Sequence, residues 1–421
     1  MKHILRLLAG VFLSSCLWIQ GATADGIIAM PELKTGKMGG VEHPSKAELL
    51  AMHQSPYILH ARGGKLTKIP VEKTHLPGDP AEWAHQAIRL ATGQDGAVYV
   101  KLFSRVCKST DGGRTWDAHP HDRSVDGSIQ VLGDGTFISL GIPGVEGEPY
   151  WRKPAEVWSS VDEGKNWKMV TRIERPTQYN GVAYEWWYAT YPLYRLSDDT
   201  LLWPVQLRNT KNTSPPYKKV LVIYRSSNGG KTWQGPLAFA DWSSEGGMVR
   251  TASGKLLAAV RYQRRLLPDD PPDLCDGRTW GGCNYYPWLK SVPYKHTFLV
   301  ESHDDGKTWK NFRQLTTTLG QCYGFPAALN DGTVVVVHTT PYGPGERGSR
   351  AIVSHDDGKT WQDEVYYLTY SEESGYNQSV TLGGDTILTV AARNDTQPFT
   401  AIRWRPVPPI DDVSSAAQKK P

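Results

Sequence analysis

One short motif occurs five times along the chain: STDGGRTW (109–116), SVDEGKNW (160–167), SSNGGKTW (226–233) and SHDDGKTW twice (302–309 and 354–361). Its general form is S-x-D/N-x-G-x-T/N-W. The Asp or Asn can accept hydrogen bonds from the amides of its own turn, and the Gly can adopt a positive φ. The closing Trp is large enough to pack against a neighbouring unit. The motif therefore predicts a tight turn that recurs in a repetitive all-β fold.

The sequence before each motif has a repeating pattern of its own. Two strands are joined by a short turn, as in SIQVLGDGTFISLGI (128–142), GMVRTASGKLLAAV (247–260) and PAALNDGTVVVVH (326–338). A sixth copy, 378–392, is followed by a last strand but no motif. Six repeats of about four strands predict an all-β, six-bladed β-propeller of four-stranded antiparallel blades over 84–407.

The chain begins like an exported protein. Lys2 and Arg6 precede an apolar stretch at 7–19, and a small-residue cleavage site follows, so 1–24 is predicted to be a signal peptide. The alternative is a lipoprotein signal that leaves a lipidated Cys16 at the new N-terminus. Either signal predicts a periplasmic or extracellular protein.

The segments that flank the repeats carry weaker signals. Within the N-terminal segment 25–83, KAELLAMH (46–53) fits a short helix, and YILHARGGKLTKI (57–69) alternates like a strand. We expect that strand to be the outer member of the last blade, where it would close the ring. The tail 408–421 is expected to be disordered.

Composition and cysteine spacing exclude several classes of protein. With 47 Lys+Arg against 43 Asp+Glu, the chain lacks the basic excess of a nucleic-acid binder. Beyond the N-terminus, no apolar run is long enough for a transmembrane segment. No cysteine spacing fits a metal site, and no cofactor is expected. Cys275 and Cys283 are the candidate disulfide, whereas Cys107 and Cys322 lie in apolar strands as expected for buried thiols.

The repeats can be superposed on the turn between their first two strands. Nine positions before that turn, the six repeats hold Ala87, Asp126, Thr190, Glu245, Tyr323 and Tyr376. Seven positions after it, they hold Phe103, Ile142, Gln206, Arg261, Thr339 and Ala392. The start of one strand and the end of its antiparallel partner lie at the same end of a sheet. The Asp, the Glu, the two Tyr and the Arg among these residues are therefore predicted to converge on one mouth of the propeller axis.

Three segments, in order, resemble the sialidase superfamily, whose Asp boxes the repeated motif also resembles. In SEGGMVRTASGKLLAAVR (244–261), the resemblance implies that Glu245 polarises the nucleophile and that Arg261 clamps the substrate carboxylate. GERGSRAIVSHDDG (345–358) resembles the segment with another clamp arginine, which is Arg347, with Arg350 as the alternative. SGYNQSVTLGGDTILTVA (374–391) resembles the segment with the tyrosine nucleophile, Tyr376. Tyr323 is expected to bind substrate beside them.

The chain departs from the family pattern in the first blade, where an arginine and a general-acid Asp are expected. The arginine position falls on Gln86 or His85, and no Asp lies between the second and third strands. Asp126 or His85 is then the candidate acid. The expected function is an exo-glycosidase that releases a terminal acidic sugar from an acidic glycan. The alternatives are a lyase that cleaves uronate polysaccharides by β-elimination, and a non-catalytic carbohydrate-binding propeller.

Overall fold

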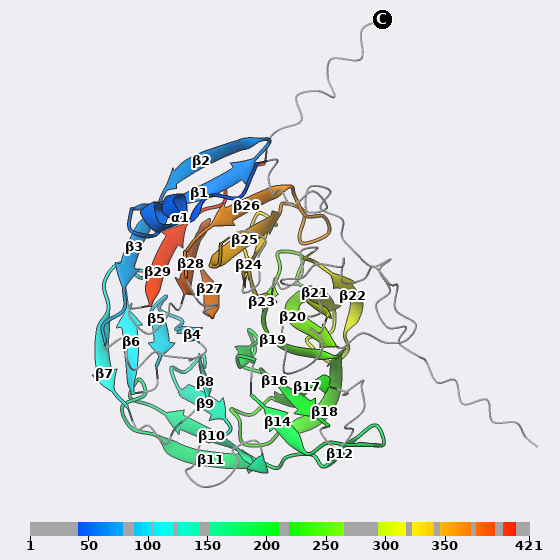
Figure 1. The fold of residues 1–421 in the computed structure, drawn as a ribbon. Coiled ribbons are helices and arrows are strands. Elements are labelled where there is room, and N and C mark those ends of the chain that lie inside the picture. The colour runs from blue at the N-terminus through cyan, green and yellow to red at the C-terminus, as the bar shows by residue number, and fades with distance from the viewer. Residues whose placement is uncertain are drawn as a thin grey trace, which may run out of the picture.

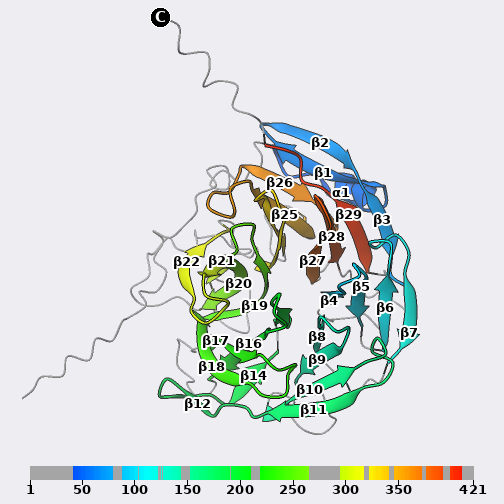
Figure 2. The same cartoon turned by 180° about the vertical axis from the view of Figure 1, so that it is seen from behind.

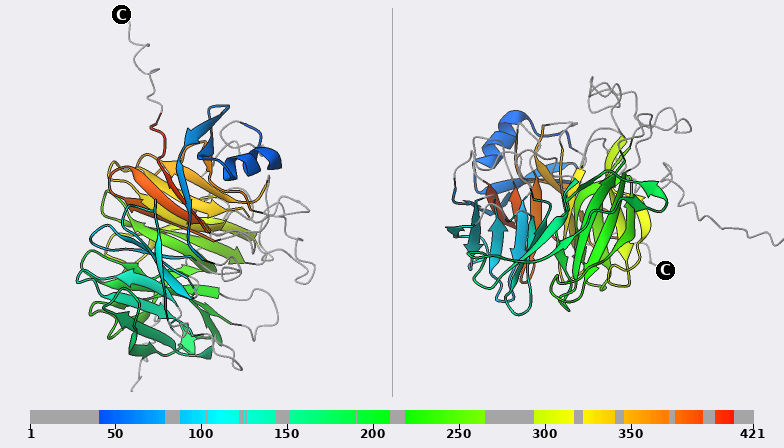
Figure 3. Two further views of the ribbon diagram at one scale, coloured as in Figure 1. Left: turned by 90° about the vertical axis from the view of Figure 1, so that its left-hand side faces the viewer. Right: turned by 90° about the horizontal axis from the view of Figure 1, so that it is seen from below.

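The computed structural model describes residues 41–78, 88–102, 104–121, 125, 127–143, 152–189, 191–209, 219–264, 294–316, 322–340, 346–371, 376–391 and 399–409. Within these ranges the chain forms six antiparallel sheets around a central axis, which confirms the predicted β-propeller (Figures 1 and 2). Figure 3 shows the ring edge-on, with the strands running between its two faces.

The blades follow one another in chain order, and the innermost strand of each comes first. Blade 1 comprises β4 (Arg89–Thr92), β5 (Val98–Lys101), β6 (Arg105–Ser109) and β7 (Asp117–Pro120). Blade 2 comprises β8 (Ser128–Val131), β9 (Phe137–Gly141), β10 (Ala155–Ser160) and β11 (Lys168–Ile173). Blade 3 comprises β14 (Trp186–Tyr188) and β15 (Tyr194–Arg195), which both pair with β16 (Leu201–Arg208), then β17 (Lys219–Ser226) and β18 (Gln234–Asp241).

The second half of the ring has the same order. Blade 4 comprises β19 (Ser243–Arg250), β20 (Leu256–Arg264), β21 (Tyr294–Ser302) and β22 (Lys310–Gln314). Blade 5 comprises β23 (Cys322–Ala328), β24 (Val334–Thr339), β25 (Ser349–Ser354) and β26 (Glu364–Tyr367). Blade 6 comprises β27 (Asn377–Leu382), β28 (Thr386–Ala391), β29 (Thr400–Trp404) and β3 (Glu72–His75). A small hairpin, β12 (Gln178–Tyr179) and β13 (Val182–Ala183), lies outside the blades.

The strand expected to close the ring pairs elsewhere. The stretch 57–69 forms two strands, β1 (Tyr57–Arg62) and β2 (Lys65–Pro70), and β1 pairs with β26 at the outer edge of blade 5. The outer strand of blade 6 is instead β3, which follows this hairpin and pairs with β29. The short helix α1 (Lys46–His53) packs its buried Leu49 and Met52 against blade 5.

A buried carboxylate holds the β1–β2 hairpin on blade 5. The side chain of Glu364 is only 1% exposed and lies 3.3 Å from both His60 Nε2 and Arg62 Nη1. Burial alone would raise the pKa of Glu364, but hydrogen bonds from His60 and Tyr366 and the charge of Arg62 outweigh it and hold the pKa below its ordinary 4.5. Its ionised form therefore stabilises the folded hairpin.

The core lies between the blades rather than within them. Six clusters of buried apolar side chains occupy the six interfaces between neighbouring blades. The repeated motif contributes to this packing. In each of its five copies the Ser hydroxyl accepts a hydrogen bond from the Gly amide, as at Ser302 and Gly306 (2.8 Å). Gly306 has a φ of 79°, which favours glycine, and a Cβ there would lie 2.7 Å from a methyl group of Leu202 in the preceding blade.

The two cysteines in the described residues are Cys107 and Cys322, and both are buried thiols, as predicted. Burial raises the pKa of the Cys107 thiol to about 12. Cys16, Cys275 and Cys283 lie outside the described residues, as do the predicted signal peptide and almost all of the predicted tail. Among the helices of the described part, none has the length and apolar character needed to cross a membrane.

Candidate functional site

Three predicted side chains meet where the inner strands of blades 4, 5 and 6 begin. The hydroxyl of Tyr376 donates a hydrogen bond to Glu245 Oε1 at 3.2 Å. The rings of Tyr323 and Tyr376 are 4.8 Å apart and meet edge to face. Glu245 is 7% exposed, whereas both tyrosines are half-buried. The structure thus brings a phenol and an almost completely buried carboxylate together at one mouth of the axis.

Backbone irregularities aim two of these side chains. The pairing of β19 with β20 shifts register between Ser244 and Gly246, which leaves Glu245 as the extra residue of a β-bulge. A Cβ at Gly246 would lie 1.9 Å from the carbonyl oxygen of Ala259, so this bulge requires glycine. Strand β23 shifts register over the same part of blade 5, and Tyr323 there has a φ of 59°. A bulge turns each side chain away from the regular alternation of its strand.

Arg261, on the mouth half of β20, joins the carboxylate to the second tyrosine. Its Nη1 forms an ion pair with Glu245 Oε2 and donates a hydrogen bond to the Tyr323 hydroxyl at 2.7 Å. Its Nε donates to Ser244 Oγ at 3.1 Å, which fixes the plane of the guanidinium. Arg261 therefore holds Glu245 on the side opposite to Tyr376.

The electrostatics keep Tyr376 protonated in the free protein. Burial, and then the negative charge of Glu245, raise the pKa of Tyr376 above its ordinary value of 10.0. Burial likewise raises the pKa of Tyr323. A neutral phenol beside a carboxylate can deliver its proton to that carboxylate as it attacks an electrophile. The pair therefore has the arrangement of a nucleophile with its base.

The two candidate arginines of blade 5 lie in different surroundings. Arg347 is half-buried and lies two residues before β25, at the same mouth as Tyr323. Arg350 is only 2% exposed; it donates to the carbonyl oxygen of Glu346 at 2.7 Å and lies 5.0 Å from the ring centre of Tyr367. With so little exposed surface Arg350 offers a substrate less to contact than Arg347 does, so Arg347 is the clamp retained in the proposal below. His85, Gln86 and Asp126 lie outside the described residues.

Several cations at this mouth were missed by the sequence reasoning. Lys219 and Lys295 stand at the mouth ends of β17 and β21, and the Nζ of Lys295 is 5.6 Å from the ring centre of Tyr323. In blade 1, the buried Lys101 donates to the carbonyl oxygens of Val125 (2.7 Å) and Gly127 (3.2 Å). Third strands also begin at the mouth, so extending the superposition to them would have identified Lys219 and Lys295.

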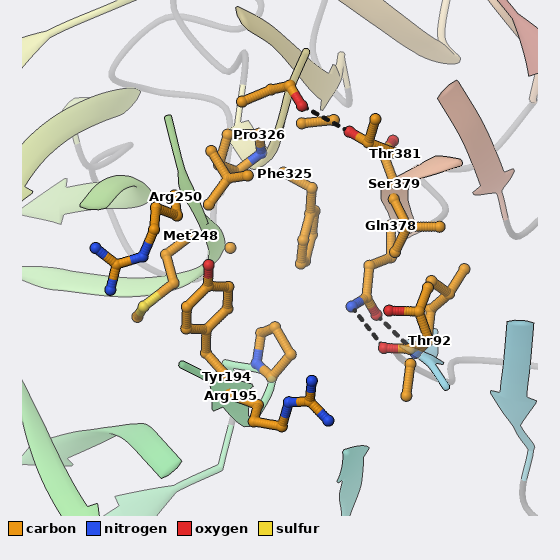
Figure 4. A pocket seen from close by; sticks show the side chains of 18 of the residues that line it. Thr92, Tyr194, Arg195, Met248, Arg250, Phe325, Pro326, Gln378, Ser379 and Thr381 are labelled. Atoms are coloured by element: carbon orange, nitrogen blue, oxygen red, sulfur yellow. Dashed lines mark hydrogen bonds between the residues drawn. The ribbon is translucent and has the colours of Figure 1, made fainter. Parts of the chain in front are cut away.

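The other end of the axis holds a cavity of about 300 Å³ (Figure 4). Polar side chains of its wall join blades to one another. Gln378 exchanges two hydrogen bonds with the backbone of Leu90, at 3.0 and 3.2 Å, and Thr381 donates to the carbonyl of Ala328 at 2.9 Å. Arg250 is engaged by Asp305 at 2.6 Å. Because these groups are already satisfied, the candidate site is the mouth that contains Tyr376. Among the described residues, no cluster of His, Cys, Asp and Glu could hold a metal ion.

Comparison with known proteins establishes the fold. No protein-family model matches the sequence, and none of the curated proteins matches it. Among solved structures, a protein of unknown function from Dyadobacter fermentans has a TM-score of 0.54 at 16% identity, covering 79% of this chain and 97% of its own. A Hadza microbial sialidase has a TM-score of 0.52 at 15% identity, covering 82% and 71%. The α-L-arabinofuranosidase of Fusarium graminearum has a TM-score of 0.50 at 13% identity, covering 79% and 97%. At such identities the likeness shows a shared sialidase-like propeller fold.

Proposed function

We propose that the protein is a sialidase-type exo-glycosidase that releases a terminal sugar acid from an acidic glycan. The observation that carries this proposal is the hydrogen bond from Tyr376 to Glu245, whose other carboxylate oxygen is held by Arg261. The shared fold with a microbial sialidase and a fungal arabinofuranosidase agrees with it. It also rests on the repeated motif and the three segments that resemble the sialidase superfamily.

The reaction divides between these residues as follows. Arg261 and Arg347 bind the substrate carboxylate, since a guanidinium is permanently charged and can make paired hydrogen bonds. Tyr376 attacks the anomeric carbon and transfers its proton to Glu245, while the bond to the leaving oxygen breaks. A neutral phenol suits this step, because a carboxylate nucleophile would be repelled by the substrate's own charge. Asp126 or His85 protonates the leaving oxygen, and water then releases the sugar from Tyr376.

The test is the initial rate on an aryl sialoside. Such a substrate has an activated leaving group, so a weak general acid does not mask a working nucleophile. We expect turnover by the wild type and a loss of at least about 100-fold in Tyr376→Phe and in Glu245→Gln. Tyr57→Phe, on the distant strand β1, is the matched control and should keep the wild-type rate. No turnover by the wild type would exclude sialic acid as the substrate.

A second candidate, β-elimination of a uronate polysaccharide, is favoured by one observation. Burial lowers the pKa of Lys295 to about 8, and this amine lies beside Tyr323. A neutral amine there could remove the proton from the carbon next to the carboxylate, while the bond to the leaving oxygen breaks, that oxygen takes up a proton and a carbon–carbon double bond forms. Polygalacturonate is a suitable probe, because the unsaturated product absorbs ultraviolet light. An increase in absorbance without sialoside turnover would favour this candidate.

A further inference from the structure

One face of blade 3 changes character towards the candidate site. Along most of its length this face packs on blade 4 through apolar side chains, among them Leu202, Leu221 and Ile223. Side chains alternate between the two faces of a strand. Towards the mouth the same face therefore carries Gln206 and Arg208 on β16, and Lys219 on β17. The interface between the two blades is thus apolar inside and cationic at its rim.

The rim residues form a row across three strands. Arg208 is paired in register with Trp186 on one side and with Lys219 on the other. Its guanidinium lies 5.3 Å from the ring centre of Trp186, and Tyr188 meets that ring at a centroid distance of 6.2 Å. All four side chains are partly exposed. Within the described part of the chain, the Nε of Arg208 has no hydrogen-bond partner.

This row adjoins the Tyr376–Glu245 site. Tyr188 is paired with Gln206, whose side chain donates to the carbonyl of Ser243 at 3.2 Å, two residues before Glu245. Burial, and then the charges of Arg261 and Arg208, hold the pKa of Lys219 well below its ordinary value. An anion bound here would relieve this repulsion and restore the charge of the amine.

Positive charge predominates on this side of blade 3. Asp241 is paired with Val220, whose side chain belongs to the core between blades 2 and 3, so Asp241 lies on the opposite face. Glu185 directly precedes Trp186 and by alternation shares the face of the buried Trp187. Among the described carboxylates, Glu245 is the one whose charge acts on Lys219, and it is already paired with Arg261.

We propose that Trp186, Arg208 and Lys219 form a subsite for a second acidic sugar, the residue next to the one that Tyr376 attacks. This rests on the proposed function and narrows its substrate class to glycans whose two outermost sugars are both anionic. Trp186 supplies an aromatic face for the sugar ring, and the two cations bind its carboxylate or sulfate. The row lies beside the reacting sugar's site, as the position of an adjoining residue requires.

Calorimetric titration of the Tyr376→Phe protein tests the subsite without turnover. Three probes are compared: sialyl-lactose, disialyl-lactose, and sialyl-lactose sulfated on the galactose. We expect the two doubly acidic probes to bind about tenfold more tightly than sialyl-lactose. Preference for only one of them would identify the second anion as carboxylate or sulfate. The preference should weaken as salt is raised.

Further substitutions in the Tyr376→Phe protein test whether the Trp186–Arg208–Lys219 row causes this preference. Arg208→Gln or Lys219→Gln should reduce affinity for the doubly acidic probes about tenfold more than for sialyl-lactose. Arg208→Lys keeps the charge and should keep most of the preference. Lys231→Gln, at an exposed turn of the same blade, is the control and should change neither affinity.

The outcomes separate this inference from the proposed function. Equal binding of all three probes, no binding of any probe, or a preference that survives both Gln variants would overturn the subsite. Hydrolysis of sialyl-lactose by the wild type together with equal binding would retain the function and reject the subsite. A charge-dependent preference for the doubly acidic probes without hydrolysis would retain the subsite and reject the proposed function.

Discussion

Replacing Gly246 by alanine tests whether the β-bulge aims Glu245. A Cβ at this position would lie 1.9 Å from the carbonyl oxygen of Ala259 and 3.1 Å from the Tyr191 ring. An ordinary carbon–oxygen contact is about 3.3 Å, so β19 and β20 would have to separate by roughly 1.4 Å. Overpacking of this kind, added to the positive φ, should cost about 3 kcal/mol or more. The expected fall in melting temperature is about 5 °C or more.

Gly254→Ala is the matched control, because this glycine lies in the β19–β20 turn at φ 87° with nothing within 4 Å of an added Cβ. It should cost only the backbone strain, about 1 kcal/mol. Thermal unfolding and initial rates on the aryl sialoside are measured for both variants. A displacement of about 1 Å at Glu245 should lower the rate about 100-fold in Gly246→Ala alone. If the two variants melted within a degree of each other at equal rates, the reasoning would be refuted.

Three other changes have defined expectations. The partners of Glu364 hold its pKa below 4.5, so its contribution to stability is present above pH 4.5 and is lost as the pH falls below that value. The melting temperature of Glu364→Gln should therefore not show this loss of stability in acid. A pH profile equal to that of the wild type would contradict the role of the Arg62 contact. Ser302→Ala leaves a buried glycine amide without its acceptor and should cost about 1–3 kcal/mol in urea unfolding; a cost near zero would show that the box turn does not depend on it. Tyr323→Phe removes the acceptor of an Arg261 hydrogen bond and should lower kcat/KM on the aryl sialoside about tenfold, and unchanged kinetics would exclude Tyr323 from the site.

The sequence predicted the ring and much of the candidate site because both follow from local periodicity. The turn between the first two strands recurs in every repeat, and superposing the repeats on it gives Glu245, Tyr323 and Tyr376 one equivalent position and places Arg261 at the adjoining end of the partner strand. The contacts between these residues agree with that alignment. Positions that recur in every blade are predictable, since each blade repeats the same strand order.

The remaining features depend on contacts between distant segments. Strand β1 pairs with β26 rather than with blade 6, and its Arg62 contacts Glu364, which lies 302 positions further along the chain. The burial of Arg350 depends on Tyr367 across the sheet. The position of Arg208 and Lys219 beside the candidate site depends on which face of blade 3 packs against blade 4. None of these pairings leaves a periodic signal in one sequence.

The central claim is that Tyr376 forms the bond to the substrate. The most direct measurement is mass spectrometry of the protein after incubation with a fluorinated sialic-acid derivative that traps glycosyl-enzyme intermediates. We predict a single adduct in the wild type, located on Tyr376 by peptide sequencing and missing in Tyr376→Phe. An adduct on Glu245, or no adduct in a protein that turns over the aryl sialoside, would contradict the account.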